Sequence, residues 1–198
     1  MPATANPLAA YRAGGTAAAV LITAFFGGLW GLTGALALPD AYSSVAILVV
    51  AAVTVALVAA AARFLRLSRR AARPSGGAGA NPFATRAYRL AVLFEAVAIP
   101  VAAIVLNNAG YPGAVVSAVA AIVGLHFFGL VPAFSSRRFA AVGGAMVFVA
   151  VFSLLLPVGV SGTSPRGAVV GLGCAFILWV GVLPFVLSAR RGANVRFD

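Results

Sequence analysis

The chain has 198 residues, of which 63% are hydrophobic and 9% charged. Soluble domains average about 25% charged residues, so this composition excludes a soluble enzyme or binding domain and indicates an integral membrane protein. The net charge of +11 comes from arginines, since the sequence contains no lysine. These arginines fall between hydrophobic runs, which predicts a topology signal and no nucleic-acid partner.

Six apolar runs follow one another along the chain, each close to the roughly 20 residues that cross a bilayer as a helix. They cover residues 16–38, 45–65, 90–106, 113–131, 139–158 and 168–187. Continuous runs of this kind predict helices, whereas barrel strands are short and alternate. The predicted fold class is therefore all-α: a polytopic membrane protein with a bundle of six transmembrane helices in a single domain, 1–198.

The first run also has a feature of secretory signal peptides. It ends in Ala35-Leu36-Ala37, which would pass as a small-residue cleavage site. Its apolar stretch is about 22 residues, against the 7–15 of a signal sequence, so we interpret it as a membrane span. Cleavage would instead leave five spans in the same orientation.

The arginines predict the orientation. Apart from Arg166, they lie before the first run, between the second and third, after the fourth and after the sixth. An arginine excess in short loops marks the cytoplasmic side, so we expect both termini in the cytoplasm. The bias toward alanine, glycine and arginine is typical of a GC-rich bacterial genome. The predicted localisation is the bacterial inner membrane.

The longest connection is the basic linker 66–89. A stripe at helical spacings of three and four leads into it. Its members are Arg63, Arg66, Arg70 and Arg73. The second helix is therefore expected to continue into the cytoplasm before Pro74 and the following glycines end it. Two interpretations stay open: a contact with anionic lipids, worth about 1 kcal/mol per arginine, or the topology signal alone.

Small residues recur at spacings that let helices approach closely. They are Gly27, Gly31 and Ala35 in the first run, and Gly167, Gly171 and Ala175 in the sixth. In lipid, helices associate through packing, so these faces predict contact seams. Internal packing is favoured over an interface in a homo-oligomer or with a membrane partner protein.

Two ionisable side chains lie inside predicted spans, Glu95 in 90–106 and His126 in 113–131. The loop between these spans is short, so they should form a hairpin. Counted from Gly110 near the hairpin tip, Glu95 lies 15 residues back and His126 lies 16 residues forward. At about 1.5 Å per residue, both reach nearly the same depth in the cytoplasmic half. Adjacent helices with the correct rotation would bring the carboxylate and the imidazole together.

The rotation of the third span has support from a smooth stripe on the face of Glu95, suited to packing inward. Its members are Ala91, Ala98 and Ala102. The face of His126 is less informative, because only Gly129 is small there.

An intramembrane charge costs about 2.5–3.5 kcal/mol for Arg, Lys or Asp at a helix centre, so Glu95 and His126 are functional candidates. One interpretation is a structural polar contact; the other is a proton-linked or substrate site. One histidine and one carboxylate are too few ligands for a typical metal centre, and a bis-imidazole haem needs a second histidine. We therefore expect no metal and no cofactor.

Catalytic motifs give no support for an enzyme. No serine stands in a G-x-S-x-G setting, and a phosphate-binding loop with its lysine is excluded by the lack of lysine.

The glutamate of the third span, Asn107 in the hairpin and GLHFF at 124–128 resemble a family of small, uncharacterised bacterial multi-span membrane proteins. The resemblance covers about residues 86–158. In that family proline directly follows HF or HFF, whereas here Gly129 holds that place. The resemblance implies that Glu95 and His126 belong together, and it implies no known activity. We group Asn107 with them in a candidate intramembrane polar site.

Two functions follow as hypotheses. The first is a small transporter-like or permease-like protein that uses Glu95 and His126 as a coupled polar pair. The second is a non-transporting membrane scaffold or accessory subunit, in which the pair and the glycine seams serve helix packing and partner binding.

Overall fold

The structure is a computed structural model that describes residues 7–70, 82–159 and 163–193. Within these ranges the chain forms six α-helices and two short 3-10 turns, η1 and η2, in the order that follows. They are α1 (Pro7–Leu36), α2 (Asp40–Arg70), η1 (Pro82–Ala84), α3 (Arg86–Asn108), η2 (Pro112–Ala114), α4 (Val115–Phe134), α5 (Arg138–Ser153) and α6 (Pro165–Ala193). The prediction of an all-helical fold is confirmed for the described residues.

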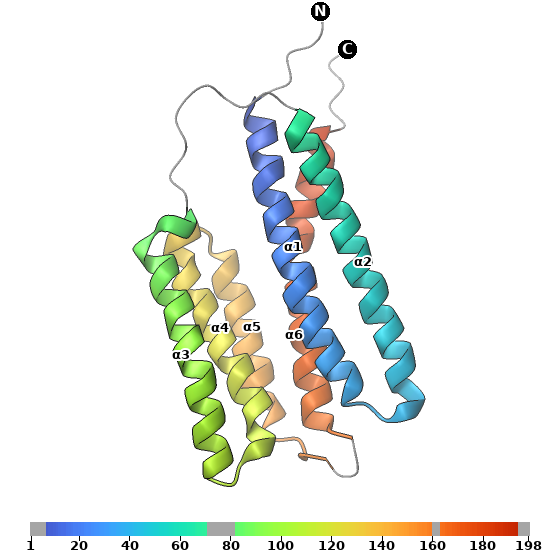
Figure 1. Cartoon of the computed structure of the whole chain (residues 1–198), viewed down its shortest axis with the longest axis vertical. Helices are drawn as coiled ribbons and strands as arrows, with labels where there is room; N and C mark the ends of the chain where they lie inside the picture. Colours follow the sequence, from blue (N-terminus) through green and yellow to red (C-terminus); the bar gives the residue numbers. More distant parts are fainter. Residues whose placement is uncertain (1–6, 71–81, 160–162, 194–198) are drawn as a thin grey trace, which may run out of the picture.

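The helices form two groups that lie side by side (Figure 1). One group contains α1, α2 and α6, and the other contains α3, α4 and α5. The groups meet where α6 packs against α5 and α4. The start of α1, the end of α2 and the starts of α3 and α5 all lie at the end of the bundle where α6 finishes (Figure 1). We call this the arginine-rich end.

Five helices are long and apolar enough to cross a membrane: α1, α2, α3, α4 and α6. The prediction for 139–158 is wrong at its C-terminal end, because α5 covers only 16 residues, Arg138–Ser153. At about 1.5 Å per residue it is roughly 24 Å long, against about 30 Å of hydrocarbon. Pro157 disfavours helical backbone at Leu156, which limits the helix from that side.

The predicted glycine seam is internal and joins α1 to α6. Pairs along the two antiparallel helices meet at Ala37 and Gly167, Gly34 and Gly171, Gly31 and Ala175, and Gly27 and Trp179. At the closest point the backbones themselves touch, since a methyl group at Gly34 would lie 2.5 Å from the Leu172 nitrogen. Only glycine allows that approach, so the seam fixes the separation of the two helices.

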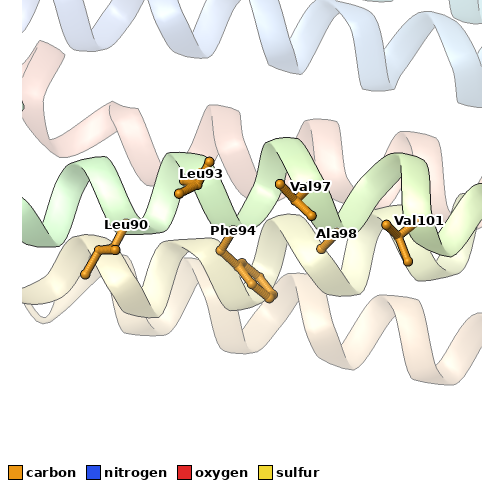
Figure 2. A pocket seen from close by; sticks show the side chains of 6 residues that line it. All are labelled: Leu90, Leu93, Phe94, Val97, Ala98 and Val101. Atoms are coloured by element: carbon orange, nitrogen blue, oxygen red, sulfur yellow. The ribbon is translucent and has the colours of Figure 1, made fainter.

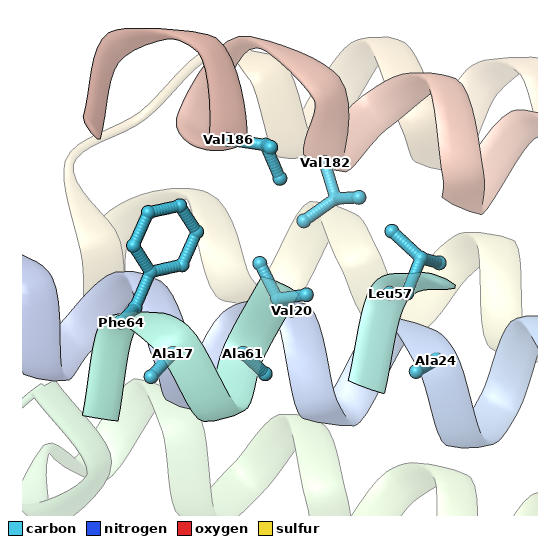
Figure 3. Packing of buried hydrophobic residues seen from close by; sticks show 8 residues of the cluster. All are labelled: Ala17, Val20, Ala24, Leu57, Ala61, Phe64, Val182 and Val186. Carbon is cyan, nitrogen blue, oxygen red and sulfur yellow. The ribbon is translucent and has the colours of Figure 1, made fainter. Parts of the chain in front are cut away.

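Buried side chains fill the space on both sides of α6. On one side, Phe64 of α2 and Val20 of α1 pack with Val182 of α6 (Figure 3). On the other side, the fully buried Met146 of α5 packs with Cys174. Cys174 is thus a small buried hydrophobic residue. Trp30 and Trp179 pack against these clusters rather than at the membrane surface.

The basic continuation of the second helix is confirmed as far as Arg70, where α2 ends. Arg63 and Arg66 are exposed on its surface. The side chain of Arg70 and the whole of Arg73 lie outside the described residues.

Candidate functional site

The site is built on the hairpin of α3 and α4. The chain reverses at Gly110, whose φ of +83° lies in the left-handed region that glycine adopts without strain. The Tyr111 amide donates back to the Leu106 carbonyl at 2.8 Å, which closes the end of α3. The 3-10 turn η2 then leads directly into α4. This short connection keeps the two helices adjacent and antiparallel, so residues at equal distance from the tip lie level.

The structure brings Glu95 and His126 together. His126 Nδ1 lies 3.1 Å from Glu95 Oε2. The same nitrogen lies 3.0 Å from the carbonyl oxygen of Ala91, one turn earlier on α3. The side chains are 26% exposed for Glu95 and 11% for His126. The imidazole therefore bridges two oxygen atoms of α3 from a mostly enclosed position on α4.

The carbonyl partner of Nδ1 allows the proton of the ring to be assigned. A backbone carbonyl oxygen can only accept a hydrogen bond. Nδ1 must then carry a proton, which leaves it as the donor to Ala91 and to the carboxylate. This geometry describes either the neutral Nδ1-protonated tautomer or the imidazolium. In both, the Glu95 carboxylate accepts from Nδ1, and its requirement for a buried partner is satisfied.

Helices α3 and α4 pack closely beside the contact of Glu95 with His126. A methyl group at Gly129 would lie 2.9 Å from the Ala91 Cβ, so this glycine is where α4 approaches α3 most closely beside the pair. Ala91 is in turn the buried residue of α3. His126 and Gly129 are one helical turn apart and both contact Ala91, so the short separation and the polar contact depend on one another.

Asn107 does not join the pair. Its side-chain Nδ2 donates to the Ala103 carbonyl of its own helix at 2.7 Å, in an exposed position. It lies 12 residues beyond Glu95, which is about 18 Å along α3. The hairpin asparagine therefore lies at the end of α3, whereas Glu95 lies near the middle of the helix.

Sequence reasoning missed a second polar centre at the opposite end of the bundle. Arg166, at the start of α6, donates to four backbone carbonyls. They belong to Ser153 at 3.1 Å, Gly113 at 3.1 Å, Leu154 at 3.2 Å and Leu156 at 2.8 Å. Helix C-termini leave carbonyls without partners. Arg166 therefore caps α5 and ties it to the beginning of α4.

A buried serine pair continues this centre into the bundle. The Ser117 and Ser153 hydroxyl oxygens lie 2.7 Å apart, and Ser153 Oγ also donates to the Ala150 carbonyl at 2.6 Å. Both serines are buried, so the network joins α4 to α5 by polar contacts in the interior. Neither serine stood in a motif, and their meeting depends on how two separate helices pack.

Among the described residues, no group of three or more His, Cys, Asp or Glu side chains gathers where a metal ion could be held. Comparisons with protein-family models, with curated proteins and with solved structures find no match for the chain. Functional inference therefore rests on the geometry of the two polar centres and of the helices around them.

Proposed function

We propose that the protein is a multi-pass protein of the bacterial inner membrane that acts as a non-enzymatic scaffold or accessory subunit. In this proposal the Glu95–His126 pair fastens α3 to the rest of the bundle. Both termini face the cytoplasm, and α5 makes a sixth, short crossing. Support for this orientation comes from the arginines of the described residues, which apart from Arg166 lie toward the starts of α1, α3 and α5 or the ends of α2 and α6. These helix ends meet at the arginine-rich end.

The observation that carries the proposal is the one-sided attachment of α3. Its substantial helix contact is with α4. Ala91 is its buried residue, and the opposite face is exposed along the length of the helix. The described polar link across this contact is the imidazole bound to Glu95 and Ala91. A helix held by one side presents its other side to the membrane or to a membrane partner.

A proton-coupled transporter or permease is the second candidate, and one observation favours it. The Glu95 carboxylate keeps 26% exposure while touching a base. Contacting acids and bases inside membranes are the groups from which proton relays are built. Against this candidate, the groove on α3 is lined by apolar side chains and includes neither member of the pair.

Replacing Glu95 with glutamine tests the two candidates. The scaffold proposal predicts a loss of about 1–2 kcal/mol in the free energy of unfolding. The reason is that the charged carboxylate, which accepts the Nδ1 proton, is replaced by a neutral amide oxygen, which is a weaker acceptor. For a chain of this length that loss lowers the thermal midpoint in detergent by about 2–8 °C. His126→Ala should give a similar loss, and the double variant should lose less than the sum.

The matched control is Asn107→Ala, which removes an exposed polar side chain from the same helix and should leave the midpoint unchanged. Reconstituted into liposomes under an imposed pH gradient, the wild type should pass no more protons than empty liposomes do. Proton flux that is present in the wild type and absent in Glu95→Gln would replace the scaffold by the transporter. Unchanged stability in Glu95→Gln would remove the fastening role.

A further inference from the structure

The outer face of α3 carries a shallow, open groove of about 420 Å³. Six side chains line it, all from this one helix: Leu90, Leu93, Phe94, Val97, Ala98 and Val101. Figure 2 shows them strung along the helix. The large members are between 45% and 59% exposed, and Ala98 is the smallest side chain among them. The groove runs from Leu90 to Val101, which is about 16 Å parallel to the helix axis.

Two arginines, Arg86 and Arg89, lie at one end of the groove. Arg86 continues its line, since Arg86, Leu90, Leu93, Val97 and Val101 follow one another at helical spacings of three and four. Arg89 lies one turn before Leu93. Both arginines are exposed, and both lie at the arginine-rich end. Within one helical turn, the surface of α3 therefore changes from two positively charged side chains to the apolar groove.

This order of charge and apolar surface matches one kind of ligand. A phospholipid in a bilayer places its phosphate at the headgroup layer and its acyl chain parallel to the membrane helices. Basic side chains at that layer attract anionic headgroups. Each contributes about 1 kcal/mol, so two arginines raise the affinity for an anionic lipid by about tenfold or more. A second copy of the chain would bring arginines against arginines at the same level, which opposes a parallel α3 dimer.

We infer that α3 carries a specific site for an anionic phospholipid, with the phosphate on Arg86 and Arg89 and one acyl chain in the groove from Leu90 to Val101. The inference goes beyond the proposed function and does not depend on the role of Glu95 and His126. It also differs from a diffuse attraction of lipid to the arginines of α2, because the groove fixes the position of the chain.

Native mass spectrometry of the full chain in detergent tests the site with two added lipids of equal chain length, phosphatidylglycerol and phosphatidylcholine. We expect one phosphatidylglycerol to bind at least about tenfold more tightly than phosphatidylcholine. Replacing Arg86 and Arg89 together with glutamine should reduce that preference to nearly none. The matched control replaces the exposed Arg63 and Arg66 of α2, also three residues apart, and should keep the preference.

Ala98→Leu fills the groove and should weaken the binding of both lipids equally. If Ala98→Leu fails to fold, the variant that replaces Arg86 and Arg89 still tests the site. Equal binding of the two lipids by the wild type would overturn the inference. So would an equal loss of the phosphatidylglycerol preference in the Arg63 and Arg66 variant, which would show that the arginines attract the lipid without a defined site. A dimer that excludes lipid and dissociates in Ala98→Leu would also overturn it, by assigning the groove to a second copy.

Discussion

Gly171→Ala should lower the midpoint of thermal unfolding by about 10 °C or prevent folding. A methyl group at this position would lie 2.7 Å from the Trp30 carbonyl oxygen and closer still to the Gly34 backbone. Because both partners are backbone atoms, no side-chain rotation relieves the overlap, and α1 and α6 must separate. Overpacking typically costs about 1–3 kcal/mol and more where backbone must move, which corresponds to roughly 2–12 °C or more for a chain of this size.

Gly144→Ala is the matched control, because the nearest atom to its new methyl group would be Phe128 Cζ at 3.9 Å. Glycine is worse than alanine in a helix by about 1 kcal/mol, so this variant should unfold at the same temperature or higher. The two substitutions are chemically identical, yet only Gly171→Ala should lower the midpoint. A similar effect of both on circular dichroism melting curves would contradict the α1–α6 seam.

Arg166→Gln should also have a large effect, a loss of about 3 kcal/mol or more in the free energy of unfolding. The guanidinium satisfies four carbonyls at the end of α5 and the start of α4. Hydrogen bonds to charged groups contribute about 1.5–3 kcal/mol each, and three of these four bonds are part-buried. Arg166→Lys should recover little, because one ammonium cannot reach carbonyls that a planar fork reaches together.

Amide hydrogen exchange locates the effect of Arg166. We expect faster exchange at Leu154, Leu155 and Leu156, whose amides donate to carbonyls in the last turn of α5. The exposed Arg63 on α2 supplies the control, since Arg63→Gln should change neither stability nor exchange at those amides. If the amides at the end of α5 exchange at the same rate in Arg166→Gln as in the wild type, the cap does not hold this helix.

Hydrophobicity and helical rise were enough to predict the helices and the level meeting of Glu95 with His126. Both depend on distance along the chain, which counting residues gives directly. The depth argument could not supply the rotation of α4, so it missed the Ala91 carbonyl and the role of Gly129 beside it. Asn107 was placed with the pair through a family resemblance, and no comparison supports that family, which stays a prediction.

Arg166 shows where sequence reasoning fails for a physical reason. In the sequence it is one arginine in a loop of the wrong parity. Its partners are carbonyls of residues up to 53 positions away, and backbone carbonyls leave no mark in a sequence. The end of α5 was predicted too late for a different reason, because the apolar run continues past Ser153 while the helix does not.

The central claim is that Glu95 on α3 accepts the Nδ1 proton of His126 on α4. His126 is the single histidine of the chain, so histidine labelled with ¹⁵N gives one imidazole in the NMR spectrum of the protein in lipid. The account predicts a protonated, hydrogen-bonded Nδ1 whose signal shifts in Glu95→Gln and stays unchanged in Asn107→Ala. A bare Nδ1, or a signal that ignores the loss of the carboxylate, would contradict it.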